Sequence, residues 1–209
     1  MNKEWVNAKL DFLYQKLGSF KEDSNNFFFE PTEEIYRNLE SGDEESLYSV
    51  ISKISKHLEI SMVPVVKYDW GIKMEPGIAG QVLIKNEYTF DAIRIPFYYV
   101  GKKYAVGEIV AHEITHVFLF SKGIFFNDVK ENEMLTDLTS VFIGLGKLIL
   151  NGKIVISDEN FSYEELGYLS FDLTMYAFEN ICERRSISLE VATRNITPEV
   201  ISKINIFNK

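Results

Sequence analysis

The stretch HEITH, residues 112–116, constrains this chain of 209 residues more than any other feature. Residues four apart lie about 40° apart around an α-helix, so His112 and His116 share one face if the segment is helical. Apolar residues recur at helical spacing on both sides of the motif, and Gly123 follows them. The sequence therefore predicts a helix over 103–121 that presents two imidazoles side by side.

The composition indicates a folded, acidic protein. Hydrophobic residues make up 46% of the chain, enough for a core, and the net charge is −9. This charge argues against the nucleic-acid backbone as the main partner, because such binding needs clustered Lys and Arg. No segment approaches the roughly 20 apolar residues of a membrane span, and residues 1–20 do not resemble a signal peptide. Since Cys182 is the only cysteine, no internal disulfide can form, and we expect a cytoplasmic protein that binds neither nucleic acid nor membrane.

Before the motif, the chain is predicted to begin with helices and to continue with strands. Helical periodicity marks three segments, at residues 3–17, 32–40 and 45–57. Three segments rich in β-branched residues and bounded by turn formers follow, at 63–69, 77–84 and 89–96. Short strands with short connections are typical of an antiparallel or mixed sheet, and we expect a small, mostly antiparallel sheet of about three strands.

After the motif, the chain is predicted to be helical again. The expected elements are helices over about 129–150 and 162–185, with a short tail helix after Pro198. No internal repeat or low-complexity linker is present. We therefore expect an α+β fold with a helical N-terminal portion (1–60) and a second portion (61–209), which together form one compact domain with helical extensions at both ends.

The histidine pair has the arrangement of two zinc ligands with a base beside them. Zinc binds imidazole nitrogen at about 2.0–2.1 Å, and two histidines on one helix face can reach the same ion. Glu113 lies about 100° around the helix from His112. It cannot share the metal there, but it can reach a metal-bound water as a general base. The alternative is a helix whose two histidines are satisfied by ordinary contacts.

A catalytic zinc site needs three protein ligands and one open position. The remaining histidine, His57, belongs to an upstream amphipathic helix and is expected at the surface or the edge of the core. Glu133 and Asp137 lie four residues apart on the next predicted helix. Glu133 can complete the zinc shell, while Asp137 accepts the free ring N–H of a ligating histidine. Glu131 is the rival ligand, and acids gathered at a helix N-terminus are the structural alternative.

The HEITH motif followed by Glu133 and Asp137 resembles the gluzincin pattern of zinc metallopeptidases. The resemblance implies one catalytic zinc ion held by His112, His116 and Glu133. It further implies that Glu113 is the general base and that Asp137 supports His112.

The run IRIPFYYVGKKYAVGEIVAHEITH also resembles the minigluzincins, including ImmA/IrrE-like proteins. Those proteins have a small sheet packed on an active-site helix and a glutamate helix. The matching region spans about 62–150, less than half of the chain, whereas 1–60 and 155–209 resemble no family. The resemblance implies a peptide or protein as substrate.

A substrate strand and an electrophile are further expectations from this resemblance. The segment GIAGQVLI (77–84) is the candidate edge strand for an extended peptide, and a covered edge with a bulge at Gly80 is the alternative. A side chain that stabilises the oxyanion is also expected. The candidates are Tyr168, Tyr176, Arg184 and Arg185. Tyrosines at helical spacing more often belong to a core, so none of these is assigned.

The sequence thus predicts a zinc-dependent metallopeptidase that hydrolyses a peptide bond by attack of zinc-bound water with the help of Glu113. The rival prediction is a non-catalytic or regulatory protein-binding module on the same kind of fold, in which zinc is structural or absent.

Overall fold

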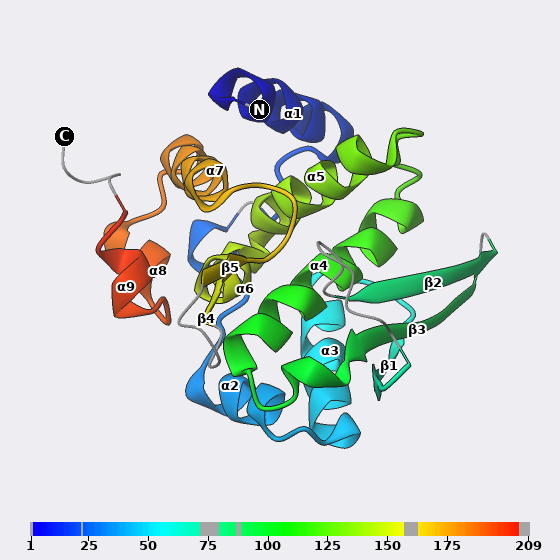
Figure 1. Ribbon diagram of the computed structural model, residues 1–209. Coiled ribbons are helices and arrows are strands. Elements are labelled where there is room, and N and C mark those ends of the chain that lie inside the picture. Colours follow the sequence, from blue (N-terminus) through cyan, green and yellow to red (C-terminus); the bar gives the residue numbers. More distant parts are fainter. Residues whose placement is uncertain (1, 22, 72–79, 87–88, 157–162, 205–209) are drawn as a thin grey trace.

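The computed structural model describes residues 2–21, 23–71, 80–86, 89–156 and 163–204, and helices make up most of this part (Figure 1). Helix α4 (Lys103–Ser121) lies between a small sheet and helices α5 and α6, and it also contacts α2 and strand β3. From residue 105 to 119 every side chain is buried except His116, which is half-buried. A helix buried on all sides belongs to the protein interior. The HEITH motif therefore lies at the centre of the fold.

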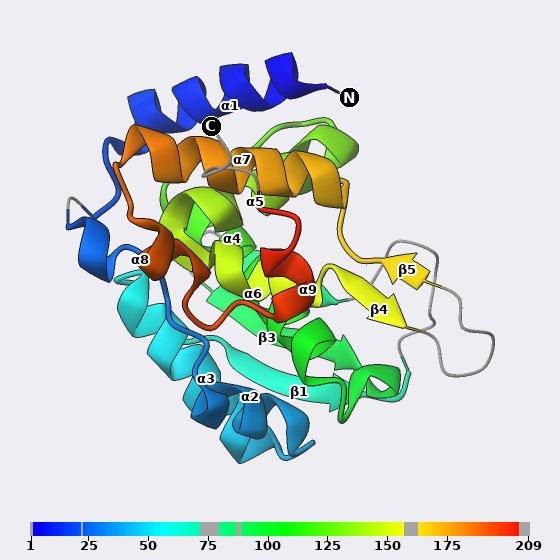
Figure 2. The same ribbon diagram turned by 90° about the vertical axis from the view of Figure 1, so that its left-hand side faces the viewer.

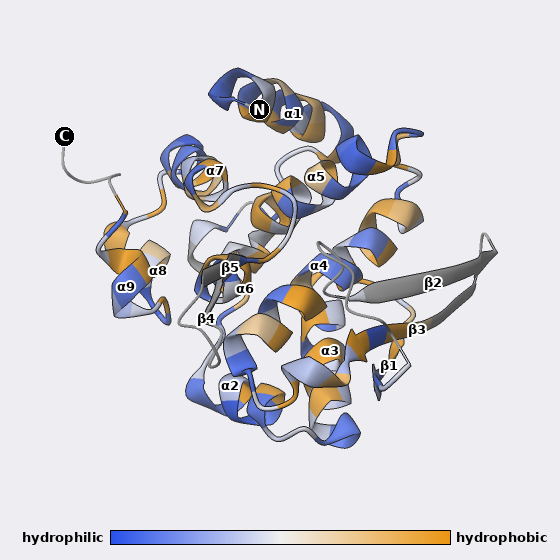
Figure 3. Ribbon diagram, viewed as in Figure 1, coloured by the Kyte–Doolittle hydropathy of each residue, from blue (hydrophilic) through white to orange (hydrophobic). Residues whose placement is uncertain are grey.

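The first three helices agree closely with the predicted ranges: α1 (Lys3–Leu17), α2 (Glu33–Glu40) and α3 (Glu44–His57). Each begins after a side chain that accepts a hydrogen bond from a backbone N–H of the first turn, namely Asn2, Thr32 and Asp43. Figure 3 shows both hydrophobic and hydrophilic residues on α1, α3 and α7, as expected for helices with one buried face.

The strands form a three-stranded sheet in the order β1-β3-β2. Its members are β1 (Val65–Asp69), β2 (Gln81–Asn86) and β3 (Thr89–Pro96). Strands β2 and β3 are antiparallel, but β1 and β3 run parallel. The predicted mostly antiparallel sheet is therefore wrong, and the sheet is a small mixed one within a largely helical fold.

The parallel pairing has a physical reason that strand periodicity does not contain. In the parallel register, Val66 is the partner of Ile93, and both side chains are buried. After β1 the chain forms β2, at the opposite edge of the sheet. It then forms β3, which lies between the two. Alternation of apolar residues indicates that a segment is a strand, but burial against the rest of the core selects its neighbour.

The predicted helix over 129–150 is interrupted. Its parts are α5 (Val129–Ser140), a π-helical turn η3 (Val141–Leu145) and α6 (Gly146–Gly152). The break is at Gly144, whose φ is 91°. A Cβ atom there would lie 2.2 Å from the backbone oxygen of Phe27. The positive φ of Gly144 interrupts the helix, and the close approach of the Phe27 backbone leaves no room for a side chain at this position.

The predicted helix over 162–185 is wrong in its first part. Strands β4 (Ile154–Ile156) and β5 (Tyr163–Glu165) pair as an antiparallel two-stranded sheet. Helix α7 begins only at Phe171 and ends at Arg184. Gly167 has φ 75°, and the side chain of Ser170 caps α7. The positive φ ends any helix that approaches from the N-terminal side.

Short elements complete the described part of the chain: η1 (Ser24–Asn26), η2 (Phe97–Tyr99), α8 (Leu189–Thr193) and α9 (Pro198–Ile201). Figure 2 shows α1 lying along α7, on the side of α5 remote from the three-stranded sheet. One hydrophobic cluster contains residues from before and after residue 60, such as Leu39 and Leu148, which both lie close to Gly107 of α4. Within the described residues, no helix is both long enough and apolar enough to cross a membrane.

Candidate metal centre

Three potential metal ligands meet between α4 and α5. His112 and His116 come from the middle of α4, and Glu133 comes from the second turn of α5. One ligand atom from each lies within 4.8 Å of the other two. The i, i+4 spacing places the two histidines on one face, and the packing of α5 on α4 brings the carboxylate opposite them.

The distances fit a tetrahedral ion. The Nε2 atoms of His112 and His116 are 3.1 Å apart, and each lies 3.0 Å from Oε2 of Glu133. Ligand atoms about 2.0–2.1 Å from a tetrahedral zinc ion are about 3.3–3.4 Å from one another. An outward shift of a few tenths of an ångström would therefore suffice to seat the ion.

The three potential ligands also favour a positive charge between them. Nδ1 of His112 lies 2.7 Å from Oδ1 of Asp137, so this nitrogen carries the proton of the neutral ring and Nε2 bears a lone pair. That lone pair faces the Glu133 carboxylate. Acceptors in such contact repel one another unless a proton or a metal ion lies between them.

The pKa values of His112 and Glu133 also indicate that a positive charge is favoured between these groups. Burial lowers the pKa of His112, but the hydrogen bonds with Asp137 and Glu133 outweigh burial and hold that pKa well above its usual value. Burial raises the pKa of Glu133, but its contacts with the two histidines outweigh burial and bring that pKa to about 2. The cluster thus attracts a cation, and a divalent metal ion satisfies all three groups at once.

Glu113 is buried on α4 beside this group but is not one of its members. The residue just before β2, Gly80, comes very close to it: a Cβ atom at Gly80 would lie 2.9 Å from Oε1 of Glu113 and 2.5 Å from Ile109. Glycine therefore permits the start of β2 to lie against α4 next to Glu113. Residues 77–79 of the expected substrate strand lie outside the described residues.

Asp137 is fully buried and uses both carboxylate oxygens. Oδ1 faces His112, while Oδ2 accepts hydrogen bonds from the backbone N–H groups of Tyr168 (2.6 Å) and Leu169 (2.8 Å) and from Nζ of Lys153 (3.2 Å). Burial raises the pKa of Asp137, but the charge of Lys153 and the hydrogen bond with His112 outweigh it and hold that pKa well below its usual range. The carboxylate therefore stays ionised.

Two buried charged residues of this region were not predicted. Lys153 follows an Asn-Gly pair, a context typical of an exposed turn, so nothing in the sequence indicated its burial. Glu108 precedes His112 by four residues, and this spacing could have placed it on the ligand face of the helix. Burial raises the pKa of Glu108 to about 7, although the charge of Lys153 opposes the rise.

Of the four oxyanion candidates, only Tyr168 lies at the cluster. Its ring stacks on that of His112, with centroids 5.9 Å apart, and its side chain is partly exposed. Burial and then the charges of Glu133, Glu113 and Asp137 raise the pKa of Tyr168 to about 12, so its hydroxyl group keeps its proton at neutral pH.

The other three candidates have partners elsewhere. Tyr176 donates to Asn7, Arg184 pairs with Asp11, and Arg185 donates to the backbone oxygen of Lys21. These contacts hold α7 against α1 and the segment that follows α1.

The rival ligand and the third histidine also lie apart from the cluster. The carboxylate of Glu131 pairs with Lys9 at 2.7 Å, and its side chain is exposed. His57 is partly buried at the end of α3, where Nδ1 lies 2.9 Å from Nζ of Lys21. Neither residue belongs to the group of His112, His116 and Glu133.

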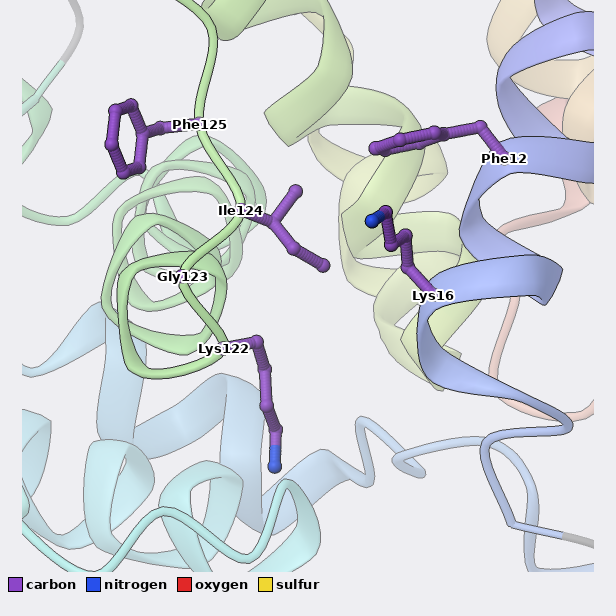
Figure 4. Close-up of a pocket in the computed structure, with 6 residues that line it drawn as sticks. All are labelled: Phe12, Lys16, Lys122, Gly123, Ile124 and Phe125. Carbon is purple, nitrogen blue, oxygen red and sulfur yellow. The ribbon is translucent and has the colours of Figure 1, made fainter.

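A cavity of about 300 Å³ lies between the end of α1 and the loop after α4 (Figure 4). It is lined by Phe12, Lys16, Lys122, Gly123, Ile124 and Phe125. In Figure 4, Ile124 points toward Phe12, whereas Phe125 points away from it. None of the three potential ligands lines this cavity, so it is separate from the metal centre.

No protein-family model, curated protein or solved structure matches the chain.

Proposed function

We propose that this protein is a zinc-dependent metallopeptidase of the gluzincin type, which hydrolyses a peptide bond in a specific protein or peptide. The observation that carries the proposal is the meeting of two Nε2 atoms and a carboxylate oxygen at 3.0–3.1 Å, with Nδ1 of His112 held by a buried, ionised Asp137. Three ligands with one position left open are typical of catalytic zinc, while structural zinc has four protein ligands.

Each residue of the site has its own role in peptide hydrolysis. His112, His116 and Glu133 hold the ion, which when bound supplies a Lewis acid that activates water and polarises a carbonyl group. Glu113 accepts a proton from the attacking water and returns it to the leaving amine. The hydroxyl group of Tyr168, beside the ring of His112, donates a hydrogen bond to the oxygen of the attacked carbonyl as negative charge develops there.

The sheet supports an extended peptide as substrate. Among the described strands, β2 has a neighbour on one side only, and its start lies against α4 next to Glu113. A peptide added along this edge would form main-chain hydrogen bonds while its scissile bond passes the metal centre. Burial of His112 and Glu113 favours a single extended chain over a folded surface.

The same proposal places the protein in the cytoplasm. Its one cysteine, Cys182, is buried, and burial raises its pKa to about 12. Such a thiol is unreactive, and the fold has no disulfide among its stabilising interactions, as is usual in a reducing compartment.

Metal content and one substitution test the proposal. Elemental analysis of the purified protein should give about one zinc ion per chain, and X-ray absorption should show three protein ligands and one non-protein oxygen. Against a library of unstructured peptides, Glu113→Gln should lower turnover by about 10²–10⁴-fold while zinc content stays unchanged.

The matched control is Glu131→Gln, which removes an exposed carboxylate of α5 and should change neither zinc content nor turnover. Full activity of Glu113→Gln would refute the role of Glu113. A protein without zinc, or with zinc in a closed four-ligand shell, would instead support a non-catalytic protein-binding module.

A further inference from the structure

Besides Glu133 and Asp137, helix α5 carries a third polar side chain that faces the histidine pair. Thr136 is fully buried, one turn after Glu133 and directly before Asp137. Its Oγ1 lies 3.3 Å from Nδ1 of His116, the ring nitrogen that does not face Glu133. Thr136 therefore faces His116, and the next residue, Asp137, faces His112.

The direction of this hydrogen bond follows from the single proton of the hydroxyl group. Oγ1 of Thr136 donates to the backbone oxygen of Asn132 at 3.0 Å, the usual contact of a threonine within a helix. With that proton used, Oγ1 can only accept from His116. The proton of the neutral ring is then on Nδ1, and Nε2 presents its lone pair to Glu133.

We propose that Thr136 is a positioning residue for the metal centre, which holds His116 in the ligating tautomer as Asp137 holds His112. The inference rests on the proposed function, because it assigns the support of the second zinc ligand. One helix thus supplies the third ligand, Glu133, and the hydrogen-bond acceptors of both histidines. A neutral acceptor suits this position, since Asp137 and Glu133 already provide two carboxylates close to the ion.

The same helix contains a matched control. Thr139 is also fully buried, and within the part of the chain that the structure describes its hydroxyl group has no hydrogen-bond partner. The substitution Thr139→Val makes the same chemical change as Thr136→Val, three residues further along α5. It removes no contact to a histidine.

Zinc affinity, measured by competition with a chromophoric chelator, tests the inference. Thr136→Val should weaken zinc binding by about 10- to 100-fold, because the Nδ1–H of His116 loses its acceptor and the ring its fixed orientation. Thr136→Ser, which keeps the hydroxyl group, should remain within about threefold of the wild type, and Thr139→Val should match the wild type. If valine at position 136 prevents folding, Thr136→Ala removes the hydroxyl group without adding a methyl group, and the same titration applies.

A spectroscopic measurement separates positioning from a general loss of stability. In the zinc-bound wild type, long-range ¹H–¹⁵N spectra should show His116 with a proton on Nδ1 that exchanges slowly, and Thr136→Val should make this exchange faster. Equal zinc affinity of Thr136→Val and the wild type, or an equal loss in Thr136→Val and Thr139→Val, would overturn the inference and leave the proposed function intact. If the wild type binds no zinc, the proposed function itself fails.

Discussion

Nδ1 of His112 lies 2.7 Å from Oδ1 of Asp137, although 25 positions separate the two residues in the chain. The contact joins the two helices that supply the potential ligands, and it fixes which nitrogen of His112 faces Glu133. It also leaves Oδ2 of Asp137 available to Lys153 and to the backbone before α7. A single buried carboxylate thus connects the metal centre to the C-terminal half of the fold.

Removal of this carboxylate should weaken metal binding. Asp137→Ala is expected to lower zinc affinity by about 10- to 100-fold, because His112 loses the acceptor that fixes its tautomer. The affinity can be measured by chelator competition. Asp128→Ala is the control: it removes an acid that caps α5 through Glu131 N–H, and should cost about 1 kcal/mol of stability without a change in zinc affinity. Equal affinities of Asp137→Ala and the wild type would contradict the assigned support.

The buried lysine behind Asp137 should matter for folding. Lys153→Met removes the lysine partner of the fully buried Asp137 carboxylate, and breaking a buried ion pair typically costs about 3–5 kcal/mol. Urea denaturation of the metal-free protein measures this loss. Lys147→Met should cost less, because the carboxylate of Glu30, the partner of Lys147, is partly exposed and can be solvated by water. A smaller loss for Lys153→Met than for Lys147→Met would show that the buried pair is not a main stabilising contact.

The break between α5 and α6 should depend on glycine. Gly144→Ala places a side chain at φ 91° and within 2.2 Å of the Phe27 backbone oxygen, so it combines backbone strain of about 1–2 kcal/mol with a clash. Gly123→Ala is the matched control, with φ 65° and nothing within 4 Å of the added atom. Thermal denaturation should therefore show a larger loss for Gly144→Ala. Equal losses would mean that the N-terminal segment gives way to the added methyl group.

Stability should depend on pH through His57. Burial, together with the charge of Lys21, lowers the pKa of His57 to about 4, whereas an unfolded histidine has a pKa of about 6.5. Between these two pH values the unfolded chain binds a proton at His57 that the folded chain does not. The contribution of His57 to the free energy of unfolding is therefore fully present above about pH 6.5 and is lost as the pH falls toward 4. The loss amounts to about 3 kcal/mol over the window. Urea denaturation of the metal-free protein at a series of pH values measures it, and His57→Gln should have a flatter profile. Parallel profiles for the two proteins would exclude this contribution.

The hydroxyl group of Tyr168 should affect turnover more than substrate binding. Tyr168→Phe keeps the ring stacked on His112 and removes the proposed donor, so kcat should fall by about 10²–10³-fold with KM little changed. Tyr176→Phe, which loses only a hydrogen bond to Asn7, should keep full turnover. Steady-state kinetics on a cleaved peptide makes the comparison, and an unchanged kcat for Tyr168→Phe would remove the tyrosine from the mechanism.

The local part of the site could be predicted from the sequence alone. Residues four apart in a helix share a face whatever surrounds the helix, so the spacing of His112 and His116 predicted their side-by-side placement, and that of Glu133 and Asp137 predicted theirs. The ranges of α1 to α4 were predictable because helical periodicity acts within a few residues, and the first three of these helices also have capping side chains.

The contacts between distant segments could not be predicted from local sequence patterns. The parallel pairing of β1 with β3 depends on which buried residues meet, and the break at Gly144 depends on the approach of Phe27. The burial of Lys153 depends likewise on Asp137, sixteen positions before it. The physical reason is the same in all three cases. Apolar burial and ion pairing depend on which residues are close in space, and a linear pattern of residues does not specify which remote segments will meet.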